Sequence, residues 1–169
     1  MTAPELNRLA EPAAREELRA CCGAAAWVEG MLGTRPWPDA AALLTSADRI
    51  WERLTQAQIT EAVRHHPRLG ESHAAASLSA RASGWSAGEQ AGVAAAETAT
   101  RAALAAGNAE YEQRFGHTFI ACASGRSAGE LLSALRQRLG NEPATELEIT
   151  ARELHKITRL RLEKLLAGA

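Results

Sequence analysis

The feature that most constrains the fold of this chain is its repeated signal for starting an α-helix. In a capping box, a Ser or Thr side chain and a Glu or Gln three residues later satisfy backbone N–H groups that the start of a helix leaves free. Between these boxes the sequence is rich in Ala, Leu and Glu, with few β-branched runs, which favours helix. We expect helices to begin at three boxes, which are Thr55 with Gln58, Ser86 with Glu89 and Ser127 with Glu130. A fourth pair, Thr145 with Glu148, is expected in the first turns of the last helix.

Glycine, proline and capping residues set the other expected boundaries. Gly23 ends the first helix, Gly33 ends the second, and Asp39 caps the third. Residues 70–84, rich in Ser, Ala, Gly and Arg, are expected to form a mobile loop. The expected helices cover about residues 11–22, 24–32, 39–54, 55–64, 86–115 and 127–139, and a last helix has Thr145 in its first turns and runs to about residue 166. Gly107-Asn108 is a weak point within the expected 86–115 helix.

Irregular segments at 65–71 and near 117–124 interrupt the expected helices. In the second segment, the run from Phe119 to Ala123 is too short for a helix and too apolar for a surface loop. We therefore expect a short buried extended strap there. Because the chain has no internal repeat and no dividing linker, the sequence predicts an all-α fold, a single-domain helical bundle over residues 1–169.

Composition narrows the classes of partner. The formal net charge is −1, and acidic and basic residues interleave, which argues against a nucleic-acid groove. No apolar run is long enough to cross a membrane, and no signal peptide is visible at the N-terminus. The three cysteines lack a disulfide or C-x-x-C spacing and indicate a reducing compartment. We expect a cytoplasmic protein.

His66 is the first candidate for chemistry. Pro67 stops the preceding helix, and it restricts the backbone of His66 more directly than that of the neighbouring His65. An imidazole exchanges protons near neutral pH, which suits proton transfer on a small molecule. The structural alternative is a histidine stabilised by the dipole at a helix C-terminus. The sequence leaves both readings open.

Glu89 and Gln90 form a second candidate group. Glu89 would complete the capping box of Ser86, and from the sequence alone this structural role is favoured. The functional alternative is a carboxylate that faces a cleft together with His66. Gln90 has no capping role, and its amide offers both a donor and an acceptor.

Arg161 and the strap are further candidates. Arg161 shares a helix face with Leu154 and Ile157, and an inward guanidinium needs an anionic partner, either a side chain or a substrate carboxylate. A cation near a helix C-terminus is the structural alternative. The strap main chain offers hydrogen bonds to a flat heterocycle with several amide groups, whereas Phe119 and Ile120 also suit plain core packing.

No metal site is predicted. His65, His66, Glu71 and His73, with a cysteine, would supply ligands, but their spacing matches no recognised pattern. Cys122 has no neighbouring motif that would activate a thiolate, so we expect it to be a small buried apolar residue.

Taken in order, these segments resemble the 2-oxo-4-hydroxy-4-carboxy-5-ureidoimidazoline (OHCU) decarboxylase family of uric acid degradation. The resemblance runs nearly end to end, and its order and spacing make it specific. The segments that carry it are Leu6-Asn7-x-Leu9, Cys22-Gly23-x-x-x-Trp27-Val28-x-x-Met31, Arg35-Pro36-Trp37, His66-Pro67-Arg68-Leu69-Gly70, Ser86-x-x-Glu89-Gln90, Tyr111-x-x-x-Phe115-Gly116-x-x-Phe119-Ile120-x-Cys122-Ala123 and Glu153-Leu154-x-Lys156-Ile157-x-x-x-Arg161-Leu162.

The resemblance implies an all-helical, usually homodimeric carboxy-lyase that makes (S)-allantoin without a cofactor or metal. The family's catalytic histidine and carboxylate fall on His66 and Glu89. The positions implied to bind the ureide substrate are Pro67, Ser86, Gln90, Phe119, Ile120, Ala121, Cys122, Ala123 and Arg161. 

Two other functions remain open from the sequence. One is a non-catalytic helical module that binds a purine breakdown product or a partner protein. The other is a domain that works fused to, or alongside, the enzyme of the preceding hydrolysis step.

Overall fold

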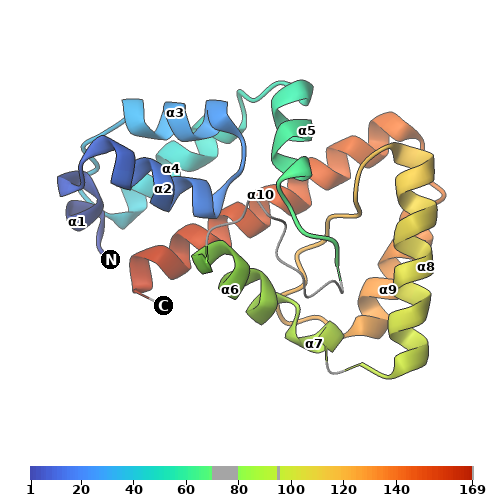
Figure 1. Cartoon of the computed structure of the whole chain (residues 1–169). Coiled ribbons are helices and arrows are strands. Elements are labelled where there is room, and N and C mark those ends of the chain that lie inside the picture. The colour runs from blue at the N-terminus through green and yellow to red at the C-terminus, as the bar shows by residue number, and fades with distance from the viewer. Residues whose placement is uncertain (70–79, 95, 169) are drawn as a thin grey trace. The chain divides into compact units, whose positions relative to one another are not determined.

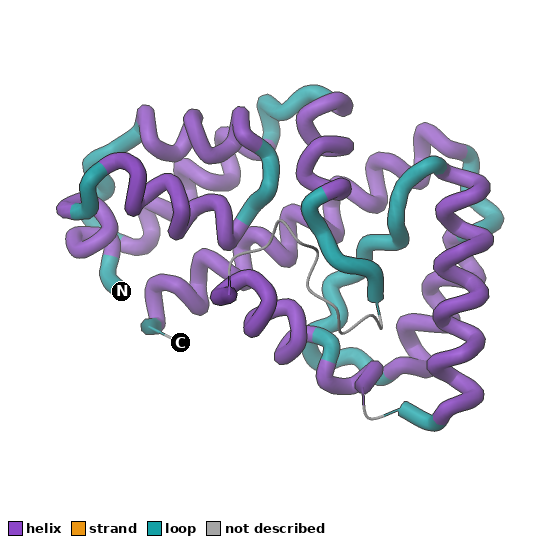
Figure 2. The backbone as a smooth tube through the Cα atoms, viewed as in Figure 1, coloured by secondary structure: helices purple, strands orange, loops and turns teal. Residues whose placement is uncertain are grey.

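A computed structural model describes residues 1–69, 80–94 and 96–168. In these residues the backbone forms helices joined by loops and turns, without a strand (Figure 2). The predicted all-α class is therefore confirmed. The helices (Figure 1) are α1 Ala3–Arg8, α2 Glu11–Cys21, α3 Ala25–Gly33, α4 Ala40–Trp51, α5 Gln56–Arg64, α6 Ala80–Glu89, α7 Ala91–Ala94, α8 Thr98–Phe115, α9 Ala128–Arg138 and α10 Pro143–Ala167. Within the described part of the chain, none of them combines the length and the apolar composition of a membrane span.

Local start signals placed several helices correctly. The Thr55 N–H donates to Gln58 Oε1 at 2.8 Å, and Gln58 N donates back to the Thr55 hydroxyl. Ser127 and Glu130 form the same reciprocal box at the start of α9. Asp39 caps α4 by accepting a 2.8 Å hydrogen bond from the N–H of Ala42.

The prediction of one long helix from Ser86 to Phe115 is wrong. Ser86 lies inside α6, Glu89 is the last residue of that helix, and the chain then forms α7 and α8. A capping residue needs a non-helical backbone, but Ala82, Trp85, Ser86 and Glu89 are all buried and follow the spacing of one helix face. Burial of that face therefore starts the helix earlier than the capping signal indicates. Of the predicted 70–84 loop, residues 80–84 are helical, and 70–79 lie outside the described residues.

The chain divides into two compact units. The first unit comprises residues 1–62 and 155–169, and the second comprises residues 63–154. Helices α5 and α10 each pass from one unit into the other without a break. Each unit has buried apolar residues of its own, and they are described separately below.

In the first unit, the side chains of two motif residues, Asn7 and Arg35, form hydrogen bonds to main-chain groups of distant segments. The Asn7 side chain donates to Trp37 O at 2.7 Å and accepts from Trp37 N at 3.0 Å. Arg35 donates to main-chain carbonyls at the end of α1, including that of Leu9 at 2.7 Å. These bonds satisfy carbonyls that a helix end leaves free. The sequence motifs around Asn7, Arg35 and Trp37 therefore have a structural explanation.

The second unit is built on the pair α8 and α9, which pack against each other. Gly107 makes this approach possible, because a Cβ atom there would lie 2.6 Å from Leu135 Cδ2. The core of the unit draws on α7, α8, α9, the strap and the segment after α5. Its buried members are Leu69, Val93, Leu104, Tyr111, Phe119, Ala121, Ala123, Ala128, Leu131 and Leu135.

Gly92 of α7 provides a test of how this unit packs. A Cβ atom at Gly92 would lie 2.7 Å from the carbonyl oxygen of Arg126, which is main chain and not a movable side-chain end. We expect Gly92→Ala to reduce the free energy of unfolding by about 1–3 kcal/mol. Gly88→Ala is the matched control, since nothing lies within 4 Å of its added Cβ. That control should be neutral or gain up to about 1 kcal/mol of helix propensity. Urea denaturation measures both, and a Gly92→Ala variant as stable as Gly88→Ala would contradict the contact.

Cys22 makes the stability of the first unit depend on alkaline pH. Burial raises the pKa of its thiol to about 11 from an ordinary value of 9.0. Below pH 9 the thiol is neutral in both states, and its full contribution to stability is present. Between pH 9 and 11 only the unfolded chain loses this proton, so the free energy of unfolding should fall by about 1.4 kcal/mol per pH unit from this group.

A Cys22→Ser variant checks this expectation, because a serine hydroxyl does not titrate in that range. Urea denaturation of both proteins at pH 8 to 11 should give a shallower decline for the variant. Parallel declines would show that Cys22 is not the cause.

Candidate active site

The second unit contains every predicted site residue except Arg161. The imidazole of His66, the carboxylate of Glu89 and the strap thus belong to a single compact body. Three segments carry them: the turn after α5, the end of α6, and the loop between α8 and α9. Each of these segments also contributes to, or directly precedes, the buried core around Leu69, Val93 and Phe119.

The segment that carries His66 is fixed on both sides. Its own N–H donates to Val63 O at 2.9 Å, one turn back in α5. On the other side, the carbonyl of Leu69 accepts from Asn108 Nδ2 of α8 at 3.0 Å, and Arg68 Nε donates to Glu112 Oε1 at 2.6 Å. Pro67 and Leu69 are buried, and the imidazole of His66 is half-buried. The backbone around the candidate proton donor is therefore held in place.

His65 and His66 have different surroundings, as the proline argument predicts. The helix ends at Arg64, and His65 is exposed, whereas His66 turns into the fold. His66 Nδ1 lies 3.5 Å from the carbonyl oxygen of Pro67. A half-buried imidazole keeps access to a bound molecule, and this suits proton exchange.

Glu89 does not cap the start of a helix, so the predicted capping role is wrong. It lies at the C-terminal end of α6, where a negative charge is disfavoured by the helix dipole. Its side chain is nonetheless buried, at 8% exposed, on the same face as Ser86. Burial on this helix face is compatible with a functional role for Glu89, which stays a prediction. Gln90 follows directly, with its amide nitrogen 3.3 Å from Ser86 Oγ.

The end of α6 is linked to the strap through α7. Gly92 lies against the main chain of Arg126, just after the strap, and Val93 is buried with Ala123. The Gln90 N–H donates to Ser86 O at 3.1 Å, and its carbonyl accepts from Val93 N at 2.9 Å, which continues the chain from one helix into the next. Packing therefore connects the position of Glu89 with the C-terminal side of the strap.

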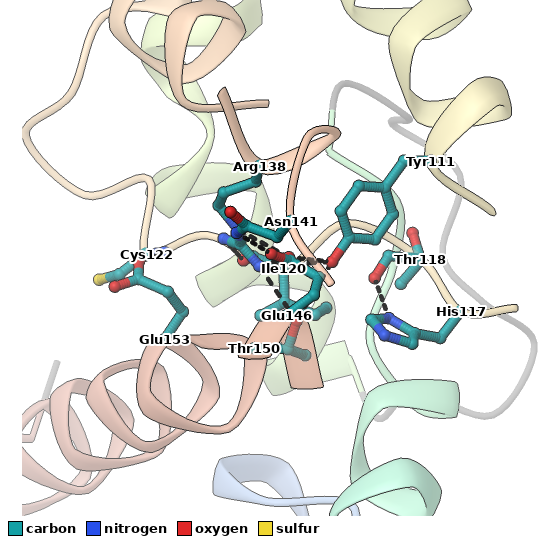
Figure 3. Close-up of polar contacts among 10 residues, drawn as sticks. All are labelled: Tyr111, His117, Thr118, Ile120, Cys122, Arg138, Asn141, Glu146, Thr150 and Glu153. Atoms are coloured by element: carbon teal, nitrogen blue, oxygen red, sulfur yellow. Dashed lines mark hydrogen bonds and ion pairs between the residues drawn. The ribbon is translucent and has the colours of Figure 1, made fainter. Parts of the chain in front are cut away.

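The strap is confirmed as a buried segment without helix or strand. Phe119, Ile120, Ala121 and Ala123 are buried, and Cys122 is half-buried. Its polar main chain is hydrogen-bonded by side chains from two helices. Arg138 Nη1 of α9 donates to Ile120 O at 2.7 Å, and Glu153 Oε2 of α10 accepts from Cys122 N at 2.9 Å (Figure 3).

Behind the strap lies a buried polar network that connects α8, α9 and α10 (Figure 3). Arg138 Nε donates to Glu146 Oε1 at 2.7 Å, and Arg138 Nη2 donates to Thr150 Oγ1 at 3.0 Å. The Tyr111 hydroxyl also donates to Glu146. Burial, followed by this bond to a carboxylate, raises the pKa of Tyr111 far above its ordinary value. The phenol therefore acts as a neutral donor.

Arg161 belongs to the first unit, on the part of α10 that follows residue 154. It is buried there, at 4% exposed, so the prediction of an inward guanidinium is correct. The thiol of Cys22 lies close enough for the positive charge to counteract part of the rise in its pKa. The role of Arg161 toward a substrate stays a prediction.

Three buried or half-buried charged residues around the strap were not predicted: Arg138, Glu146 and Glu153. A usable signal exists for the first, because Leu131, Leu135 and Arg138 follow the spacing of one helix face. This is the same argument that identified Arg161.

The hypothetical metal ligands do not come together in the described residues. Glu71 and His73 lie outside these residues. Within the rest of the chain, no three His, Cys, Asp or Glu side chains form a group that could hold a metal ion.

Comparisons with known proteins agree with the resemblance. The sequence model of the OHCU decarboxylase family matches residues 7–163. The chain is 34% identical over 133 residues to the 2-oxo-4-hydroxy-4-carboxy-5-ureidoimidazoline decarboxylase of Amia calva, which covers 78% of this chain and 75% of that protein. It is 35% identical over 151 residues to the uric acid degradation bifunctional protein TTL of Arabidopsis thaliana, covering 89% of this chain. The match spans 46% of the Arabidopsis protein, so this chain spans about half the length of that relative.

Solved structures give the same result. A crystal structure of OHCU decarboxylase in the presence of (S)-allantoin superimposes with a TM-score of 0.77 and 32% identity, covering 90% of this chain and 98% of that chain. A crystal structure of (S)-allantoin synthase has a TM-score of 0.71 and 17% identity, covers 97% of this chain and 54% of that chain, and supports the fold alone. Because the family match runs through both units and nearly the whole sequence, the chain belongs to the OHCU decarboxylase family, a family of decarboxylases and therefore lyases.

Proposed function

We propose that this chain converts OHCU into (S)-allantoin and CO2 during uric acid degradation. The observation that carries the proposal is the family match over residues 7–163. A 32% identical structure of an OHCU decarboxylase, obtained in the presence of (S)-allantoin, supports a ureide as the ligand. Residues 1–169 would work as one domain, since the match continues through both units. We further propose a cytoplasmic homodimer.

The reaction needs no electron sink beyond the substrate itself. OHCU carries a carboxylate and a hydroxyl on one ring carbon, next to a ring C=N bond. When the C–CO2 bond breaks, its electron pair forms a C=C bond, and the electrons of the C=N bond move to nitrogen, which takes a proton. The resulting enaminol loses its hydroxyl proton, and the former imine carbon gains one. The net change is uptake of one proton and release of one CO2.

His66 is proposed to deliver the proton to carbon. Delivery from one face determines the (S) configuration, which requires a donor whose position is fixed. The hydrogen bonds on both sides of His66, to Val63 and from Asn108 to Leu69, are the basis for that assignment. Pro67 contributes by restricting the backbone that carries the imidazole.

Glu89 is proposed to bind the ring hydroxyl and to accept its proton as the enaminol becomes a ketone. A buried carboxylate suits this task because hydrogen bonds strengthen where water is excluded. Ser86, Gln90 and the strap main chain from Phe119 to Ala123 would bind the urea and ring amides. The N–H of Cys122 already donates to Glu153, so the neighbouring strap groups are the better candidates.

Replacement of His66 tests the proton donor. We expect His66→Asn to fold like the wild type and to lose roughly 10²–10⁴-fold in turnover, the contribution of a positioned acid–base group. His65→Asn is the matched control, because it removes an exposed imidazole one residue away and should leave turnover unchanged. Circular dichroism measures (S)-allantoin against the racemic product of the spontaneous reaction. Wild-type rates from His66→Asn would refute the assignment.

Replacement of Glu89 by Gln tests the need for a charge at nearly constant volume. A hydrogen bond to a charged group contributes about 1.5–3 kcal/mol, so kcat/KM should fall by roughly 10- to 100-fold. Because the substitution nearly conserves the volume of this buried side chain, we expect the melting temperature to change little. A large loss of melting temperature with unchanged kcat/KM would instead assign Glu89 a structural role.

A further inference from the structure

Two side chains of opposite charge bind the main chain of the strap, at positions that are two residues apart. A cation, Arg138, binds the carbonyl of Ile120 at 2.7 Å, and an anion, Glu153, binds the N–H of Cys122 at 2.9 Å (Figure 3). Each charge meets the main-chain group that it binds best, and hydrogen bonds with one charged partner are the stronger kind. We refer to these two hydrogen bonds as the strap tethers.

The tethers fix the orientation of the residue between them. The carbonyl of Ile120 and the N–H of Ala121 belong to one peptide plane, and the carbonyl of Ala121 and the N–H of Cys122 belong to the next. In a planar trans peptide the N–H and C=O point in opposite directions, and the cis bond of the described chain is at Arg35–Pro36. The N–H of Ala121 therefore points away from Arg138, and its carbonyl points away from Glu153.

Ala121 consequently presents one donor that points away from the Arg138 tether and one acceptor that points away from the Glu153 tether. Such a pair complements the N–H and C=O groups of a ureide or a ring amide. Ala121 is itself buried, at 7% exposed, so its N–H and C=O need partners other than bulk water.

The hydrogen bond from Arg138 to the strap requires two charged side chains, Arg138 and Glu146, to be buried away from water. Arg138 is 7% exposed, Glu146 is 0% exposed, and Nη2 of the guanidinium lies 2.6 Å from the carboxylate. A buried ion pair is weak evidence for stability, because desolvation offsets the attraction, and apolar residues often replace such pairs without loss. The network instead gives the guanidinium a fixed direction. It also places Cζ 4.6 Å from the centre of the Phe119 ring.

We propose that Arg138 and Glu153 are positioning residues, which set the two peptide planes around Ala121 so that its N–H and C=O bind the ureide part of the substrate. This inference rests on the proposed function, because it assumes that the strap binds the ureide. Neither residue touches the substrate in this scheme. Both act through the strap.

Glu153 gives the clearest test, because it is half-buried and its replacement should not prevent folding. Glu153→Ala removes the acceptor for the N–H of Cys122, whereas Glu153→Gln keeps a carbonyl oxygen there. We expect KM to rise roughly tenfold in Glu153→Ala with a smaller change in kcat, since binding before the chemical step is lost. Glu153→Gln should restore most of the wild-type KM.

Arg138 is tested by a pair of variants of the same network. Arg138→Lys keeps the positive charge but loses the fork that reaches both Glu146 and Ile120. Tyr111→Phe removes a hydrogen bond to Glu146 and leaves the strap bond in place. Both should lower the melting temperature, but only Arg138→Lys should raise KM. If Arg138→Lys does not fold, the Glu153 variants decide the matter.

Hydrogen exchange of the Cys122 amide adds a measurement independent of turnover. This amide should exchange faster in Glu153→Ala and remain protected in Glu153→Gln. Wild-type KM values in both Glu153→Ala and Arg138→Lys, with an active wild type, would overturn the positioning role and leave the proposed function intact. An inactive wild-type chain would refute the proposed function itself.

Discussion

The structure depends on one constraint: buried main chain that is not helical must still have hydrogen-bond partners. The strap brings such main chain into the core of the second unit, between α8 and α9. Arg138 and Glu153 satisfy two of its polar groups, and the ion pair with Glu146 holds Arg138 in place. An ordinary apolar core would not require these charges. Their presence indicates that the strap has a specified orientation as well as a specified place.

The motifs shared with the family divide into two kinds. In the first unit, the Asn7 side chain bonds the main chain of Trp37, and the Arg35 side chain bonds the carbonyl of Leu9. These motif residues therefore have a structural role. For His66 and Glu89 we propose a chemical role instead. His66 lies in a turn that its neighbours fix, and Glu89 is buried at a helix end where the dipole disfavours its charge. The family motifs therefore contain residues that stabilise the fold and residues to which we assign a chemical role.

Local signals predicted much of the fold. Helix boundaries are defined by the capping pairs at Thr55 and Ser127 and by the proline after His66. These signals act through contacts a few residues apart, so the local sequence is enough to predict the boundaries. The same reasoning failed at Ser86, because burial of Trp85 and its neighbours on one helix face outweighs a local capping pattern. The roles of Arg138, Glu146 and Glu153 depend on three helices and a strap that are distant in sequence. Helix-face spacing could have identified Arg138 as inward, but not its partners.

A crystal structure of the full chain with (S)-allantoin tests the central claim most directly. The account predicts product density within hydrogen-bond reach of the His66 imidazole, the Glu89 carboxylate and the N–H and C=O of Ala121, with both strap tethers intact. Product bound elsewhere, or His66 and Glu89 facing separate cavities, would contradict it.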